Sequence, residues 1–510
     1  MRFTTMLLRA ALLLQSILAD QVLGVASLDD STRARCPSGW QIQRELGPRL
    51  SEKAAVAVPS SSDWDRLMVR AAAPRISPRF MASVEVATEK DVQETIKYAN
   101  HIGVPFLVVS GGHGQPTTLN NLHCGIQINM RKMNDTTVSK DGKTATGGGG
   151  VMQHEIVASL FKQGKMAVTG LCECVSLAGP LLGGGHSMLQ GRYGFSADNL
   201  VSARLVLANG SAVTASAAEN PDLFWAIRGA GHNFGVATSL QVKVYDATQN
   251  WTMIIFTFTQ DKLERFFNTW NRVEDENDDH GTIVLNGHMG RDPDIDSVHP
   301  VIGLAIFFKG QNNVIGAYTS AFLALGPVSH TTVTDIPYGD LYDTGGMGTD
   351  GLVCRDDHNI LGYPSSFPRW DADAMRAGFA LFSEFTGSEK FATSAWLLES
   401  YGRKGVETVP EDSNAVSPED RRYHLLTSPM LWWAGDDEQD RARAMSFGKR
   451  MQTAVRRNSK TPPHAYVNYA FGGEPLPEVY GRDGARLARL KRLKAEYDPH
   501  NRFGFYVPIR

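Results

Sequence analysis

The sequence predicts an α+β protein with two main domains, and three observations support this prediction. Its 510 residues are 42% hydrophobic and 21% charged, a composition that can bury the cores of two or three domains. Residues 80–245 show strand, helix and strand patterns in which glycines follow the strands. After a polar stretch at residues 246–250, long alternating strands separated by amphipathic helices predict an antiparallel sheet backed by helices.

The N-terminal domain begins with one strand, helix and strand unit. Residues 82–87 are predicted to form a strand, residues 88–103 a helix capped by Thr88, and residues 104–112 a buried strand that ends in glycines. Further strands and helices are expected at residues 125–130, 144–164, 201–217 and 222–245. An Asn-Gly pair within the third of these segments predicts a tight turn between two strands.

The C-terminal half is predicted to form the antiparallel sheet and the helices that cover it. Strands are expected at residues 253–260, 281–290 and 301–310, and helices at residues 261–273 and 312–326. The last predicted element, within residues 480–503, is a basic amphipathic helix whose positive residues we expect to face solvent.

The first residues predict a secretory signal peptide at residues 1–26. Arg2 and Arg9 precede the apolar stretch 10–18, and small residues at Ala19 and Ala26 suit cleavage. A membrane anchor is the alternative, but this apolar stretch is far shorter than the ~20 residues that span a bilayer. We therefore expect a secreted or secretory-pathway protein without a membrane partner.

Charge and cysteine content narrow the possible partners further. Lys and Arg number 51 against 54 Asp and Glu, so a net charge of -3 offers no basic surface for nucleic acid. Sequons at Asn134, Asn209 and Asn250 are compatible with passage through the secretory route. The chain has five cysteines, an odd number for an oxidising compartment, so at least one sulfur needs a role other than an internal disulfide.

Two glycine-rich segments predict a ligand site. Residues 110–114, Ser-Gly-Gly-His-Gly, end a strand with bare backbone amides that can form a phosphate site, although they match neither a P-loop nor a dinucleotide fingerprint. Residues 170–199 repeat glycines at many positions, which predicts that a large phosphorylated cofactor lies on the backbone. Cys172 and Cys174 are half of a possible zinc site, but a second pair at metal-ligand spacing is missing, so we expect no metal.

The same segments resemble the berberine bridge enzyme-like flavoproteins, whose FAD domain is named after p-cresol methylhydroxylase (PCMH) and vanillyl-alcohol oxidase. The resemblance is greatest to fungal FAD-linked oxidases of secondary metabolism. The matching blocks are residues 88–114, 170–200, 222–245, 465–473 and 490–503. The resemblance implies a PCMH-type FAD-binding domain at 76–247, a substrate-binding domain at 248–465, and a C-terminal segment at 466–510 that returns to the FAD domain.

The resemblance also implies how FAD is held. His113 matches the histidine that is bonded to the 8α-methyl of the flavin, and Cys172 matches the cysteine that is bonded to C6. Val175 matches the position facing the flavin edge where dioxygen reacts, while Cys174 is expected only to pack, pointing away on an extended strand. The remaining residues expected to contact the cofactor are Ser110, Gly111, Gly112, Gly114, Gly170, Gly183, Gly184, Gly235 and Val236.

The resemblance also implies that the C-terminal Tyr-x-Asn-Tyr motif carries the catalytic residues, here Tyr466, Asn468 and Tyr469. We expect Tyr466 to be the base; on a strand, Asn468 would share its face and Tyr469 would not. Glu399 and Tyr401 are rival candidates for the base.

The resemblance implies an oxidase that takes a hydride from a small natural product and gives dioxygen two electrons to form hydrogen peroxide. A carbohydrate oxidase of the same fold is one alternative. A flavin-carrying protein without turnover is another, and the sequence leaves the oligomeric state and the disulfide pairing of Cys36, Cys124 and Cys354 open.

Overall fold

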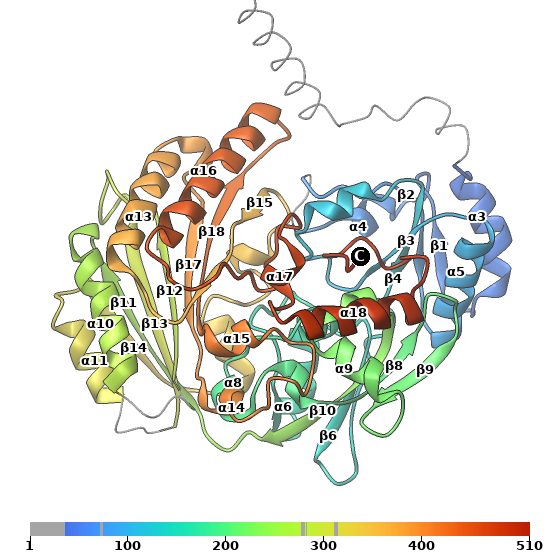
Figure 1. Ribbon diagram of the computed structural model, residues 1–510, viewed down its shortest axis with the longest axis horizontal. Coiled ribbons are helices and arrows are strands. Elements are labelled where there is room, and N and C mark those ends of the chain that lie inside the picture. The colour runs from blue at the N-terminus through green and yellow to red at the C-terminus, as the bar shows by residue number, and fades with distance from the viewer. Residues whose placement is uncertain (1–35, 72–74, 277–280, 282, 311–314) are drawn as a thin grey trace, which may run out of the picture.

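Two lobes lie side by side in the computed structural model (Figure 1), which describes residues 36–71, 75–276, 281, 283–310 and 315–510. The predicted signal peptide lies outside these residues. The first lobe holds two sheets and most of the N-terminal half, and the second holds one large sheet with its helices. The predicted α+β class is confirmed.

The first sheet of the N-terminal lobe has the strand order β1-β2-β4-β3. Its strands are β1 (Ala55–Ala57), β2 (Phe80–Glu85), β3 (Phe106–Val109) and β4 (Gly125–Asn129). Strands β2, β4 and β3 are parallel, as the strand, helix and strand pattern predicts, and β1 adds an antiparallel edge. Helix α5 (Glu89–His101) connects β2 to β3, and the predicted cap is confirmed because Thr88 and Asp91 form a capping box.

The second sheet of this lobe is antiparallel, with the order β5-β6-β10-β8-β9 and β7 paired to β10. Its strands are β5 (Thr136–Val138), β6 (Thr144–Gly148), β7 (Lys165–Ala167), β8 (Leu200–Val206), β9 (Ala212–Ser216) and β10 (Val236–Asp246). The predicted turn between β8 and β9 is confirmed, with Asn209 Oδ1 accepting from the Ser211 N–H.

The second lobe is built on one antiparallel sheet with the order β14-β11-β13-β12-β17-β18-β15 and β16 paired to β18. Its strands are β11 (Trp251–Phe258), β12 (Ile283–Gly290), β13 (Val301–Lys309), β14 (Ser329–Ile336), β15 (Asn359–Gly362), β16 (Ser365–Phe367), β17 (Ala395–Ser400) and β18 (Leu425–Trp433). The predicted antiparallel sheet is confirmed.

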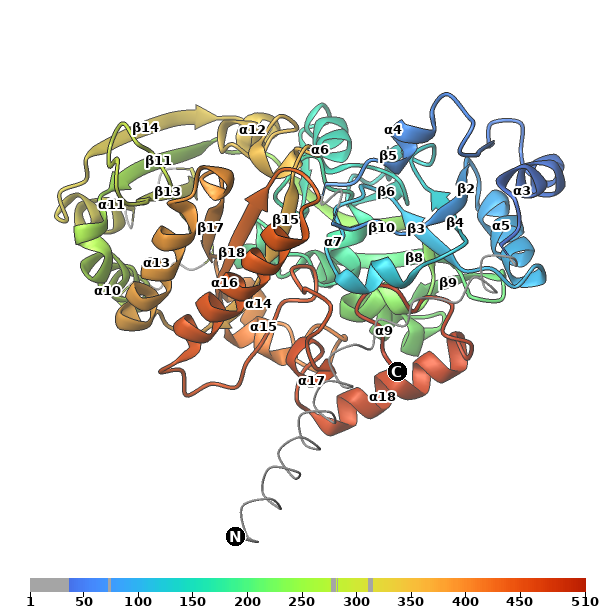
Figure 2. The ribbon, with the colours of Figure 1, turned by 90° about the horizontal axis from the view of Figure 1, so that it is seen from above.

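Long helices cover the outer face of this sheet, away from the first lobe (Figure 2). They are α10 (Leu263–Glu276), α11 (Ile315–Leu323), α13 (Ala372–Thr386) and α16 (Glu438–Arg456). Between helices and sheet lies an aromatic core in which Phe266, Trp270 and Trp396 are fully buried. Burying each such side chain contributes ~1.5–3 kcal/mol or more, so this face fixes the sheet and leaves its other face for the first lobe.

The C-terminal segment returns to the first lobe, where α18 (Gly484–Tyr497) packs on α9 (Pro221–Ala230). The expectation that the basic residues of this helix all face solvent is wrong. Lys494 is buried, and its Nζ donates to the Asn233 carbonyl at 2.9 Å and pairs with Asp498 at 2.6 Å. A buried lysine is stable here because a carboxylate and backbone oxygens accept its hydrogen bonds.

Shorter helices complete the described chain. They are α3 (Gly39–Leu46), α4 (Trp64–Met68), α6 (Gln153–Phe161), α7 (Ala178–Leu182), α8 (Gln190–Tyr193), α12 (Leu341–Thr344), α14 (Lys404–Glu407), α15 (Pro418–Arg422) and α17 (Leu476–Val479). Among the helices of the described residues, none has the length and apolar character needed to cross a membrane.

Candidate functional site

A cavity of 320 Å³ lies where the two lobes and the C-terminal segment meet. Residues predicted from both glycine-rich segments and from the C-terminal motif line it together, although they are far apart in the sequence. The predicted residues at its wall are Ser110, Gly111, Gly112, His113, Gly114, Gly170, Cys172, Val175, Gly235, Val236, Tyr466, Asn468 and Tyr469.

The loop at residues 110–114 follows β3 and presents backbone donors to this cavity. Ser110 Oγ donates to the Gly149 carbonyl at 2.8 Å, which ties the loop to the second sheet. Gly112 has a φ angle of 74°, a backbone conformation that residues other than glycine rarely adopt. Among the described residues, none accepts a hydrogen bond from the backbone N–H groups of residues 111–114. Successive free N–H groups of this kind form an anion site.

His113 stands at the end of this loop as a neutral imidazole. Burial and the nearby positive charge of Arg70 lower the pKa of His113 to about 4, and only a hydrogen bond with the Cys174 backbone opposes this. A neutral imidazole retains a nitrogen lone pair, so His113 can act as a nucleophile at neutral pH.

Cys172 is a free cysteine that lines the same cavity. Burial, and secondly the carboxylate of Glu399, raise the pKa of the Cys172 thiol to about 12. This thiol is therefore protonated at neutral pH in the structure, and it needs a proton acceptor before it can form a bond to carbon.

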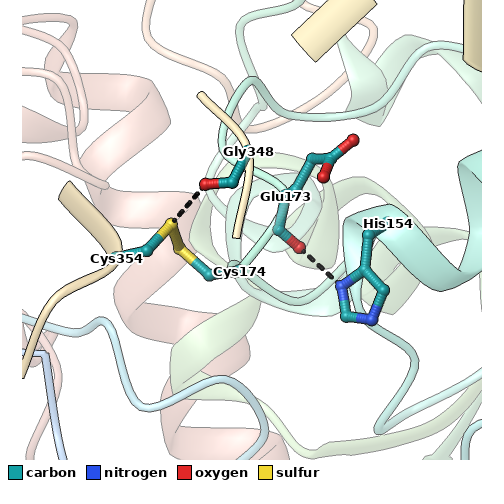
Figure 3. The surroundings of a disulfide bond; sticks show 5 residues. All are labelled: His154, Glu173, Cys174, Gly348 and Cys354. Atoms are coloured by element: carbon teal, nitrogen blue, oxygen red, sulfur yellow. Dashed lines mark hydrogen bonds between the residues drawn. A yellow bond between two sulfur atoms is a disulfide. The ribbon is translucent and has the colours of Figure 1, made fainter. Parts of the chain in front are cut away.

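The expectation that Cys174 only packs is wrong, because it forms a disulfide with Cys354 (Figure 3). Residues 172–175 form a turn closed by the Val175 N–H donating to the Cys172 carbonyl at 3.1 Å, so side chains do not alternate as on a strand. The Glu173 N–H also donates to the Met347 carbonyl at 2.9 Å. This turn of the first lobe is thus joined to the second lobe by a covalent bond and a hydrogen bond.

The two disulfides together account for four of the five cysteines and bear on the zinc alternative. Cys36 forms a disulfide with Cys124, which leaves Cys172 as the unpaired sulfur that the odd cysteine count predicts. Since Cys174 is bonded to Cys354, the Cys-x-Cys pair does not supply two thiolates to a metal.

The Tyr-x-Asn-Tyr motif forms a turn and not a strand, so the alternation that would separate Tyr469 from Tyr466 does not apply. The Tyr469 N–H donates to the Tyr466 carbonyl at 2.9 Å, and both rings and Asn468 reach the cavity. The Tyr466 hydroxyl accepts from the Gly185 N–H at 2.9 Å and from Asn468 Nδ2 at 2.6 Å. A weaker third donor is the His186 N–H at 3.3 Å.

Tyr469 has the opposite arrangement, because its hydroxyl donates to Glu399 at 3.1 and 3.2 Å. Glu399 lies on β17 and is 4% exposed. Burial raises the pKa of Glu399 to about 7, although the nearby hydroxyls of Tyr401 and Tyr469 oppose this. The oxygen of Tyr469 can therefore accept a proton on its cavity side while its own proton moves to Glu399.

Comparison with known proteins agrees with this geometry. A model of the FAD binding domain matches residues 81–216, and one of berberine and berberine-like proteins matches residues 465–510. The FAD-linked oxidoreductase OXR2 of Pyricularia oryzae is 35% identical over 92% of both chains. The chain belongs to the berberine bridge enzyme-like FAD-linked oxidoreductases.

Solved structures with low sequence identity show the same fold. Xylooligosaccharide oxidase from Myceliophthora thermophila is 22% identical, with a TM-score of 0.78 over 92% of this chain and 99% of that one. Glucooligosaccharide oxidase from Acremonium strictum is 18% identical, with a TM-score of 0.75 over the same shares. Because the FAD binding domain model matches residues 81–216, the first lobe is the FAD-binding lobe, and we call the cavity the flavin cavity.

The residues of the flavin cavity fit FAD. Free backbone N–H groups on residues 111–114 suit its diphosphate, and the wall of the cavity is largely apolar, as an isoalloxazine and an adenine require. A nucleophilic His113 and a free Cys172 lie on this wall.

Gly183 and Gly184 are predicted cofactor residues that do not line the flavin cavity. A Cβ on Gly183 would lie 2.2 Å from Asn468 Oδ1, so glycine is required there by the C-terminal segment. Gly184 lies against Val416 and Tyr466. The small size of Gly183 thus lets the Tyr-x-Asn-Tyr turn pack closely against this segment.

Sequence reasoning missed several residues of the cavity. Some of these residues lie outside the sequence motifs, and others lie inside them without a predicted role. They are Arg70, Gln115, His186, His232 and Tyr506. His186 illustrates why: its ring is stacked on Tyr401 at 4.9 Å, a contact between segments more than two hundred residues apart. Only the three-dimensional packing brings such residues to the wall.

Proposed function

We propose that this protein is a secreted FAD-dependent oxidase that removes a hydride from a small organic substrate of secondary metabolism, with dioxygen as the electron acceptor and hydrogen peroxide as a product. The observation that carries the proposal is the flavin cavity itself. It brings a phosphate-binding loop, two potential attachment residues and the Tyr469–Glu399 pair to one space.

The proposal includes covalent attachment of FAD through His113 and Cys172. Glucooligosaccharide oxidase from Acremonium strictum carries a 6-S-cysteinyl, 8α-N1-histidyl FAD, and this chain has a histidine and a free cysteine at its cavity wall. When bound, the flavin accepts a hydride and passes electrons on. The neutral state of His113 supports its role as a nucleophile.

In this proposal Tyr469 takes the substrate proton and Glu399 receives the proton of Tyr469. The hydrogen bond between them supplies the path, and a pKa of about 7 makes the carboxylate of Glu399 a suitable acceptor. The three N–H donors on the Tyr466 oxygen also favour a phenolate, but among the described residues no carboxylate accepts the hydroxyl proton of Tyr466. Its hydroxyl hydrogen remains available to bind the substrate.

The second lobe favours an apolar substrate over a sugar. Its contribution to the flavin cavity consists of apolar side chains, namely Val353, Ile360, Leu397 and Met430. A sugar presents many hydroxyl groups that would lose hydrogen bonds to water against such a wall, at a cost of ~1–3 kcal/mol for each group left without a partner. We therefore propose a small natural product with an apolar ring or chain next to the oxidised C–H bond.

Oxidation by dioxygen and secretion are supported by further observations. Val175 is a small residue at the cavity wall, which leaves room for dioxygen. Two disulfides suit an oxidising compartment, and the sequon residues Asn134, Asn209 and Asn250 are all exposed.

The test uses protein secreted by a eukaryotic host, mixed without oxygen with a panel of apolar alcohols, phenols and amines and with oligosaccharides. We expect a yellow protein whose flavin absorbance bleaches with an apolar member of the panel and returns with air, forming hydrogen peroxide. Bleaching by oligosaccharides alone would instead support a carbohydrate oxidase. A colourless protein would contradict the proposal as a whole.

A further inference from the structure

Arg70 is a buried arginine whose hydrogen-bonding groups are mostly unused. It is 6% exposed, and its Nη2 donates to the Gly114 carbonyl at 3.2 Å. Its Nε and Nη1 atoms are buried and have no hydrogen-bond partner among the described residues. Charged donors that are buried and unpaired destabilise a protein strongly, so this side chain is expected to have a partner in the functional protein.

The main chain places Arg70 directly against the loop at residues 110–114. A Cβ on Gly112 would lie 3.6 Å from the Val69 carbonyl oxygen and 3.8 Å from the Cα of Arg70. The charge of Arg70 also acts on His113, where it favours the neutral imidazole. The guanidinium therefore shares its surroundings with the free N–H groups of this loop.

The charge of the cavity wall is unbalanced without a ligand. Among the described residues that line the flavin cavity, Arg70 has the only permanently charged side chain, and none is Asp, Glu or Lys. FAD carries its negative charge on the diphosphate, and an arginine fork matches phosphate oxygens well. A buried cation beside free backbone donors is the arrangement that such an anion requires.

We propose that Arg70 binds the diphosphate of FAD together with the backbone N–H groups of residues 111–114. The Gly114 carbonyl orients the guanidinium through Nη2, and Nε and Nη1 are the donors to the phosphate oxygens. Arg70 thereby anchors the cofactor independently of any bond to His113 or Cys172.

The test measures flavin binding in a His113→Ala, Cys172→Ala background, where no covalent bond retains the ligand. Dissociation constants for FAD and for riboflavin, which lacks phosphate, are measured by titration with and without Arg70→Gln. We expect Arg70→Gln to weaken FAD binding about 10- to 100-fold and to change riboflavin binding less than about threefold. Arg70→Lys keeps the charge but not the fork, so it should weaken FAD binding less than Arg70→Gln does.

Arg75 provides the matched control. It is 5% exposed and comes from the same segment, but its Nε and Nη2 donate to the carbonyls of Ile360 and Gln115, and it does not line the cavity. Arg75→Gln should therefore leave the ratio of FAD to riboflavin affinity unchanged.

If Arg70→Gln fails to fold, dissociation constants for ADP and for adenosine are measured in the His113→Ala, Cys172→Ala protein and in the same protein with Arg70→Lys. Arg70→Lys should weaken the binding of ADP and leave the binding of adenosine unchanged. Equal losses for FAD and riboflavin, or no loss for FAD, would overturn the proposal.

Discussion

The two lobes line their halves of the flavin cavity with different kinds of chemical group. The FAD-binding lobe uses backbone groups in loops that directly follow strands, as at residues 110–114, together with His113 and Cys172. The second lobe uses apolar side chains on distant elements, such as Leu397 on β17 and Met430 on β18. The first half suits a ligand that is the same throughout a family, and the second can change with the substrate at little cost to the fold.

The largest expected effect concerns the FAD-binding half. His113→Ala combined with Cys172→Ala should abolish covalent attachment, because both proposed bonding atoms are removed. Denaturation in acid, followed by absorbance of pellet and supernatant, measures this directly: the flavin should stay with the wild-type polypeptide and leave the double variant.

The single variants are the controls for that experiment. Each of His113→Ala and Cys172→Ala should retain flavin in the pellet through the remaining bond. If the wild-type protein releases all of its colour, attachment through these residues is disproved, while noncovalent FAD binding is left intact.

The local nature of the FAD-binding half explains why its loop was predictable from sequence. The glycines at residues 110–114 and Cys172 can be recognised from the sequence alone, because backbone conformation and residue chemistry are properties of a short segment. The expectation for Cys174 failed because it assumed an extended strand, whereas a turn directs its sulfur to Cys354. Arg70 was missed since one arginine in a connecting segment has no pattern of its own.

The next effect tests the proton path that crosses between the halves. Tyr469→Phe removes the hydroxyl that bonds Glu399 and should slow flavin reduction by substrate about 10²- to 10⁴-fold, with flavin content unchanged. Stopped-flow reduction without oxygen measures it. Tyr466→Phe is the comparison variant, and a larger loss there than in Tyr469→Phe would make Tyr466 the base.

The pH dependence of flavin reduction sharpens the same assignment. Burial raises the pKa of Glu399 to about 7, so its carboxylate, the proton-accepting form, becomes populated as the pH rises through that value. The reduction rate should therefore increase with pH across neutrality in the wild-type protein. Glu399→Gln should lower the rate and lose this increase; an unchanged profile in that variant would remove Glu399 from the path.

A third effect concerns the covalent connection between the two halves. Cys174→Ser with Cys354→Ser removes a bond that spans 180 residues of sequence, and the loss should cost about 2–4 kcal/mol of stability. The midpoint temperature of thermal unfolding and the affinity for substrate should both fall, because the turn that carries Cys172 loses its covalent connection to the second lobe. Cys36→Ser with Cys124→Ser is the control, since this bond lies within the FAD-binding lobe and should lower stability alone.

The smallest expected effect tests the apolar half. Leu397→Gln places an amide on the wall where Leu397 now stands, and it should weaken binding of an apolar substrate about tenfold by removing buried apolar contact. The KM should rise while the limiting rate of flavin reduction and the flavin spectrum stay near those of the wild-type protein, because the FAD-binding half is untouched. Leu397→Met conserves volume and apolar character and should bind substrate almost normally. A Leu397→Gln variant that binds the substrate as tightly as the wild type would show that the second lobe does not select substrates by apolar contact.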